Sequence, residues 1–189
     1  MRGAPAPLPE EVAADQGTRF IQITHGGWDH HQGIYDRNEV NGRAVGSNLY
    51  ASCGAFDPGF STLISDLEAG GLLDETLVVV SGEFGRTTGP LTNDRSGRDH
   101  YQQMFYVFAG GGVVGGKIIG ETDATGSFTV DPGWSRFRNV RPEDVDATMF
   151  SALGINWTTR LDDDPLGRGF YYIPEAENDI YAPIDELWG

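Results

Sequence analysis

The chain has 189 residues, of which 13 are basic and 28 acidic, so its formal net charge is −15. An acidic surface of this kind repels phosphate backbones, which excludes nucleic acid as an expected partner. Hydrophobic residues make up 39% of the chain, enough to build a core, and this excludes an intrinsically disordered protein. The apolar runs are far shorter than the roughly 20 residues of a membrane helix, so we expect no membrane span.

The length suits one domain, since domains typically contain about 100–150 residues. We expect this domain at residues 18–158, preceded by a flexible Pro/Ala-rich arm at 1–17. An extended tail at 159–189 is expected to pack on the domain, because prolines interrupt it at three positions: Pro165, Pro174 and Pro183.

The first predicted element is a strand at Arg19–Thr24, where polar and apolar residues alternate before two glycines. A helix is predicted to follow, with Asp57 as its N-cap and Pro58 at its first position. Apolar residues recur at helical spacing after Pro58, and the pair Gly70 and Gly71 is expected to end the helix.

The run Thr76–Val80 is rich in β-branched residues, which is typical of a strand buried on both faces of a parallel sheet. Met104–Ala109 is a third run of this type, and a second helix is predicted at Pro142–Leu153. A strand, a helix and a strand joined by short connections indicate a right-handed crossover. The sequence therefore predicts an α/β fold with a mostly parallel sheet.

Residues suited to chemistry follow the ends of the first two predicted strands. The loop at 25–31 contains three of the four histidines, and the loop at 81–86 contains Glu83 and Arg86. Ligands of open α/β sheets bind outside the carboxyl ends of the strands. His100 precedes the third predicted strand, so it reaches the same edge only if the loop at 87–99 folds back.

Asp29, His31, Glu83 and His100 together form a mixed set of carboxylates and imidazoles. Such a set suits a divalent metal, with zinc or manganese favoured over magnesium or calcium. Arg86 is the candidate clamp for an oxyanion, because its fork matches the geometry of phosphate or sulfate. The alternative remains open that the histidines are ordinary surface residues and that Glu83 is a loop acid paired with Arg86.

Several motifs in chain order resemble those of the domain of unknown function family numbered 1501. They cover most of positions 18 to 156 and include Gly26-Gly-Trp-Asp29-x-His31, Gly70-Gly-Leu-Leu-Asp-Glu-Thr-Leu-Val, Gly82-Glu-Phe-Gly-Arg-Thr87, Gly97-Arg-Asp-His100 and Ile119-Gly-x-Thr-Asp123. The resemblance implies membership of the alkaline phosphatase and sulfatase superfamily. That superfamily hydrolyses phosphate or sulfate esters at a metal centre in a three-layer α/β/α sandwich.

The resemblance also implies roles for single residues. Asp29 and His31 look like the ligands of one metal, Glu83 falls where relatives place an acid, and His100 resembles a late histidine ligand. Phe84 stands where relatives outside the family often carry a ligating histidine. Family members are roughly twice as long, so the chain resembles their C-terminal half and is expected to be an incomplete copy of the fold.

The first functional hypothesis is therefore a metal-dependent hydrolase domain acting on small-molecule phosphate or sulfate esters. The nucleophile would come from a missing N-terminal half, and no residue of this chain is assigned to that role. The alternative is a non-catalytic metal-binding or interaction domain that keeps the fold, and a third possibility is a gene fragment with no independent role. Family resemblance suggests export to the periplasm or beyond the cell, although no export signal is recognised in the chain.

Overall fold

A computed structural model describes residues 17–92 and 94–189. The chain divides into two compact units, one ending at Gly110 and one spanning Gly111–Gly189. The expected arm at 1–17 lies outside the described residues except for Gly17. Within the described ranges, no helix combines the length and apolar character needed to cross a bilayer.

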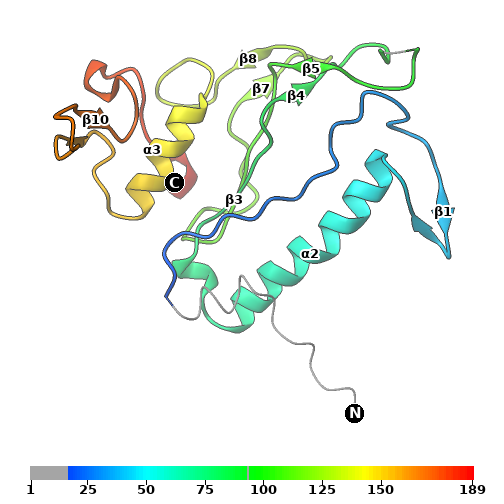
Figure 1. The fold of residues 1–189 in the computed structure, drawn as a ribbon, viewed down its shortest axis with the longest axis horizontal. Coiled ribbons are helices and arrows are strands. Elements are labelled where there is room, and N and C mark those ends of the chain that lie inside the picture. Colours follow the sequence, from blue (N-terminus) through cyan, green and yellow to red (C-terminus); the bar gives the residue numbers. More distant parts are fainter. Residues whose placement is uncertain (1–16, 93) are drawn as a thin grey trace. The chain divides into compact units, whose positions relative to one another are not determined.

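The first unit is built around helix α2 (Leu49–Ala69), the long cyan helix of Figure 1. Asn48 caps the helix, because its side chain accepts a hydrogen bond of 2.9 Å from the backbone N–H of Ala51. The helix therefore begins nine residues before the predicted start, and Pro58 lies inside it. A proline there costs one intrahelical hydrogen bond, which a helix of 21 residues tolerates.

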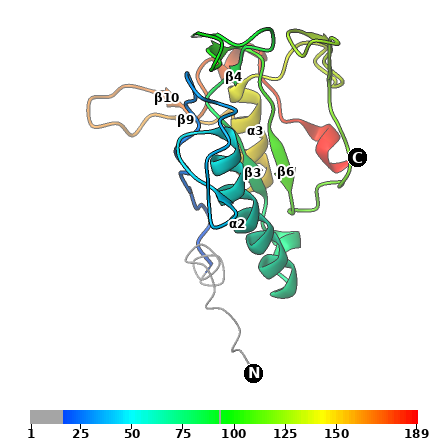
Figure 2. The ribbon, with the colours of Figure 1, turned by 90° about the vertical axis from the view of Figure 1, so that its right-hand side faces the viewer.

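The strands of the first unit are short and pair in an antiparallel manner. β1 (Glu39–Val40) pairs with β2 (Arg43–Ala44), and a 3₁₀ helix, η1 (Leu73–Glu75), precedes β3. β3 (Val78–Val80) pairs with β6 (Val107–Ala109), as Figure 2 shows. These two strands lie within the runs predicted at Thr76–Val80 and Met104–Ala109, but their residues are half-buried, apart from the exposed Val107, and not buried on both faces.

The prediction of a mostly parallel three-layer α/β/α sandwich is wrong. The structure has two α-helices among its described residues, and each described sheet contains two antiparallel strands. The crossover argument fails because β3 pairs with β6 in opposite direction, although a helix precedes β3. The segment predicted as the first strand, Arg19–Thr24, is not assigned as a strand, and without it no parallel pair forms around α2.

The second unit is built around helix α3 (Pro142–Ala152), which confirms the second predicted helix to within one residue. Pro142 occupies its first turn, and Asp144 completes a capping box with the backbone of Arg141. Two antiparallel pairs accompany it: β7 (Glu121–Thr122) with β8 (Thr129–Asp131), and β9 (Arg160–Leu161) with β10 (Phe170–Tyr171).

The core of the second unit joins α3 to the end of the chain. Two 3₁₀ helices, η2 (Ala176–Asn178) and η3 (Asp185–Trp188), lie in this C-terminal stretch. The core residues combine one helical alanine with apolar side chains from the final segment: Ala147, Ile173, Ala176 and Tyr181.

Candidate functional site

The N-terminal part of α2 holds the loop at 25–31 in place. Ser52 donates a hydrogen bond of 2.8 Å to the carbonyl of Gly27, and its oxygen lies 3.2 Å from Nε2 of His30. Because the hydroxyl proton goes to Gly27, Ser52 can accept from a protonated Nε2 of His30. His30 is buried, and this burial lowers the pKa of its imidazole below the usual value. His30 is thus an internal anchor of the loop, since its buried side chain contacts Ser52 of α2.

The loop at 87–99 folds back and brings His100 to the same place. β4 (Gly85–Arg86) pairs with β5 (His100–Tyr101), so that Arg86 lies opposite His100. The backbone N–H of Thr87 donates to the carbonyl of Asp99 at 3.0 Å and extends this pairing. The sequence analysis required the loop at 87–99 to fold back for His100 to reach the candidate site, and this antiparallel pairing shows that it does.

Two close backbone contacts of this hairpin require glycine, one to the histidine loop and one to the segment that follows β5. A Cβ atom at Gly97 would lie 1.8 Å from the carbonyl oxygen of His31, and one at Gly85 would lie 1.6 Å from that of Gln103. Both distances are far below any van der Waals contact, so only glycine permits these backbones to approach each other. A hydrogen bond of 3.1 Å from the N–H of Arg98 to the carbonyl of His30 then joins the two segments.

Asp29, His31 and His100 form a compact triangle of ligand atoms. The Oδ1 atom of Asp29 lies 3.0 Å from Nε2 of His31 and 3.3 Å from Nε2 of His100. The two Nε2 atoms are 3.1 Å apart. Two ligands held about 2.0–2.1 Å from one tetrahedral zinc ion lie about 3.3 Å from each other, so the three residues fit a divalent cation.

Asp99 orients His31 within this triangle, a role that sequence reasoning missed. Its Oδ1 atom lies 3.0 Å from Nδ1 of His31. A carboxylate that accepts the Nδ1–H proton leaves Nε2 free to bind a metal, and such pairs are common at metal-ligating histidines. The adjacency of Asp99 to His100 in the chain was the only sequence signal for this role.

We expect the substitution Asp99→Ala to weaken zinc binding by about 10–100-fold, because His31 would lose its fixed tautomer and orientation. Asp99→Asn keeps an acceptor oxygen and should recover part of the affinity. Competition titrations with a chromogenic chelator measure both variants. Equal affinities for Asp99→Ala and the unmodified protein would show that Asp99 does not position His31.

Arg86 reaches into the triangle from β4. Its guanidinium lies 2.6 Å from Oδ1 of Asp29 and donates to the carbonyl of Arg98 at 3.1 Å. The hydrogen bond from Arg86 to Asp29, with a smaller contribution from His100, holds the pKa of the Asp29 carboxyl below its usual value. Asp29 therefore stays ionised to a lower pH than a free aspartate.

Removing the guanidinium should raise the pKa of Asp29 toward that of a free aspartate. We expect this shift in Arg86→Met, measured by carboxyl ¹³C NMR during a pH titration. Arg37→Met is the matched control, because the guanidinium of Arg37 contacts the hydroxyl of Tyr50. An Asp29 titration that is the same in all three proteins would contradict the assignment of Arg86 as the cause.

Glu83 lies outside the triangle. The group of carboxylate and imidazole atoms within 4.8 Å of one another consists, among the described residues, of Asp29, His31 and His100. Glu83 is exposed in the turn between β3 and β4. The next residue, Phe84, packs its ring 4.2 Å from that of His100 and so supports the imidazole from one side.

A family model described as protein of unknown function (DUF1501) matches residues 8–172. The chain belongs to this family. The DUF1501 match includes every residue of the triangle together with Arg86 and Asp99. No curated protein and no solved structure matches the chain.

Proposed function

We propose that this DUF1501 protein binds a divalent cation through Asp29, His31 and His100 and that the site serves the hydrolysis of phosphate or sulfate esters. The triangle of ligand atoms, with edges of 3.0, 3.1 and 3.3 Å, carries the proposal. The donor set of two imidazoles and one carboxylate favours zinc or manganese over magnesium or calcium. The ester class comes from the likeness of the metal motifs to those of the alkaline phosphatase and sulfatase superfamily.

The number and exposure of the ligands favour catalysis over a purely structural role. Structural zinc sites are closed by four protein ligands, whereas catalytic sites have three and leave a position for substrate. The side chains of Asp29 and His100 are 69% and 51% exposed, so a substrate can reach an ion between them. The chemistry that a divalent cation supplies in such a position is polarisation of an ester oxygen and neutralisation of developing negative charge.

Arg86 is the residue that would hold the transferred oxyanion. In the described structure its guanidinium and the two imidazoles all contact Oδ1 of Asp29. With a cation held by Asp29, His31 and His100, Arg86 would share this oxygen less and could turn an N–H group toward an anionic oxygen of the substrate beside the metal position.

Zinc and manganese titrations of the unmodified protein and of the combined variant Asp29→Ala, His31→Ala, His100→Ala test the cation site. We expect binding with the unmodified protein and its loss in the variant. Glu83→Ala is the matched control: the geometry predicts unchanged affinity, while the four-ligand set expected from the sequence predicts a loss. Metal binding that survives the combined variant would reject the site.

Hydrolysis is assayed separately with aryl phosphate and aryl sulfate esters in the presence of each metal. Turnover that depends on metal and falls in Arg86→Met supports the proposed reaction. Tight metal binding without turnover of either ester class would instead favour a non-catalytic metal-binding domain.

A further inference from the structure

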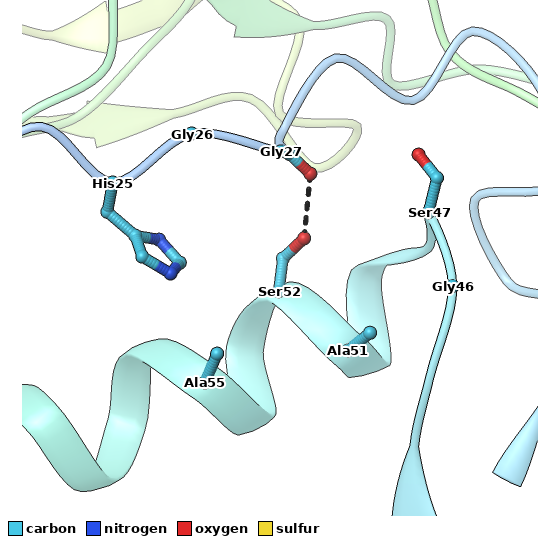
Figure 3. Close-up of a pocket in the computed structure, with 8 residues that line it drawn as sticks. All are labelled: His25, Gly26, Gly27, Gly46, Ser47, Ala51, Ser52 and Ala55. Atoms are coloured by element: carbon cyan, nitrogen blue, oxygen red, sulfur yellow. Dashed lines mark hydrogen bonds between the residues drawn. The ribbon is translucent and has the colours of Figure 1, made fainter.

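Hydrogen bonds hold both the loop at 25–31 and the ring of His31 within it. Ser52 of α2 donates to the carbonyl of Gly27 in this loop, as Figure 3 shows. The carboxylate of Asp99 lies 3.0 Å from Nδ1 of His31 and sets the orientation of that ring. The ligands that this loop contributes are therefore fixed by polar groups outside the triangle.

His100, the ligand from β5, is held differently. Within the described part of the chain, its side chain makes polar contacts with Asp29 and His31, and both contacts involve Nε2. Metal-binding histidines almost always donate their other ring N–H to a carboxylate, a carbonyl or water. The described residues supply no such acceptor for Nδ1 of His100, and the side chain is 51% exposed. Its orientation must therefore depend on a contact of another kind.

The register of the β4–β5 pair places an aromatic ring beside His100. Arg86 lies opposite His100, so the two side chains project from the same face of the pair. Phe84 precedes Arg86 by two residues, and side chains two apart in an extended segment share a face. Diagonal neighbours across an antiparallel pair lie within reach of an aromatic side chain. The ring centroids of Phe84 and His100 are 4.2 Å apart, with 39° between the planes.

The ring of Phe84 is itself held in place. The guanidinium carbon of Arg86 lies over its face, 5.8 Å from the centroid, and Arg86 donates to the carbonyl of Arg98 at 3.1 Å. The face of an aromatic ring attracts positive charge. An imidazole that binds a divalent cation takes up part of the positive charge of the ion. The contact between Phe84 and His100 should therefore become more favourable when a cation binds.

We infer that Phe84 is a positioning residue of the metal site. Its ring replaces a hydrogen-bond acceptor and holds the imidazole of His100 with Nε2 toward Asp29 and His31. The inference rests on the proposed function for its effect on a metal, whereas the orientation of His100 by Phe84 needs none. The side chain at this position must be aromatic, because a flexible aliphatic chain offers neither a flat face nor an attraction for positive charge.

The conformation of the His100 side chain tests the inference in the metal-free protein. We expect its χ1 couplings, measured by NMR, to report one rotamer in the unmodified protein and in Phe84→Tyr. In Phe84→Leu they should report an average over several rotamers. Phe105→Leu is the matched control, because Phe105 is 80% exposed in the same unit, and it should leave the couplings unchanged. A single His100 rotamer that persists in Phe84→Leu would overturn the inference.

Zinc titrations test whether Phe84 acts on the metal through His100. Phe84→Leu should weaken zinc binding by about tenfold, the size expected for an aromatic contact, and Phe84→Tyr should keep the affinity. In a His100→Ala background, Phe84→Leu should cause no further loss, because the residue through which Phe84 acts is absent.

Two results of these titrations would contradict the assigned role. One is equal affinity in Phe84→Leu and the unmodified protein, and the other is a tenfold loss that persists in the His100→Ala background, as a general effect on the hairpin would give. If zinc does not bind the unmodified protein but the His100 couplings change as expected, the cation proposal fails and the orientation of His100 by Phe84 stands.

Discussion

The substitution Gly97→Ala should weaken zinc binding by at least about 100-fold, because a displacement of about 1 Å in a functional group has effects of this size. The added methyl group would lie 1.8 Å from the carbonyl oxygen and 2.0 Å from the carbonyl carbon of His31. Both are backbone atoms, so no change of side-chain rotamer relieves the clash. The loop at 25–31 must move away from the hairpin, and the distance between His31 and His100 must increase.

Gly89→Ala is the matched control for this prediction. Gly89 lies in the same loop, and a Cβ atom there would meet no atom within 4 Å. Its φ is not in the left-handed region, so alanine is compatible with the backbone. Zinc titrations of both variants, with thermal melts of the metal-free proteins, decide the outcome. Similar affinities in the two variants would show that the close approach at Gly97 does not set the ligand geometry.

The substitution Asp144→Ala should destabilise the second unit by about 3–5 kcal/mol, the typical cost of removing one partner from a buried ion pair. Asp144 is fully buried and binds Arg138 through both carboxylate oxygens, at 2.7 and 2.8 Å. It also accepts from the backbone N–H groups of Arg141 and Ala182, at 2.7 and 3.0 Å. One side chain thus joins the start of α3 to the C-terminal segment, and alanine would leave four N–H donors, from three residues, in need of new partners.

Hydrogen exchange of the α3 amides, followed by mass spectrometry, measures this loss within the second unit. Asp163→Ala is the control, because it removes the same charge from an exposed position in the same unit. Exposed substitutions of this kind usually change stability by less than about 0.5 kcal/mol. Exchange rates that are equal in the two variants would contradict the assigned role of Asp144.

The local signals in the sequence located parts of the fold well. Pro142 followed by two acidic residues marked the start of α3 correctly, because the first turn of a helix favours proline and negative charge. The β-branched residues of Val78–Val80 marked a real strand. The start of α2 was wrong: Asp57 and Pro58 form a strong local start signal, but Asn48 caps the helix earlier and the chain continues through the proline.

The sequence predicted the types of residue that form the candidate site, but it did not predict in full which residues lie together there. Asp29, His31 and His100 were chosen as ligands because of their chemistry and their positions beside strand ends, and the structure brings these three together. Glu83 satisfied the same criteria and lies apart from them. Asp99 was not chosen, because its function depends on the direction of a His31 nitrogen 68 positions away in the chain.

The amino-acid sequence alone determined the residue types available for chemistry and the position of α3, since both follow from local composition and spacing. Only the tertiary structure decided the antiparallel pairing of β3 with β6, the return of β5 onto β4 and the grouping of three of the four candidate ligands. These depend on contacts between segments far apart in the chain, and strand direction leaves no local pattern in two or three residues. The close packing permitted by Gly97 brings the loop at 25–31 against the hairpin, because an added methyl group would separate Asp29 and His31 from His100.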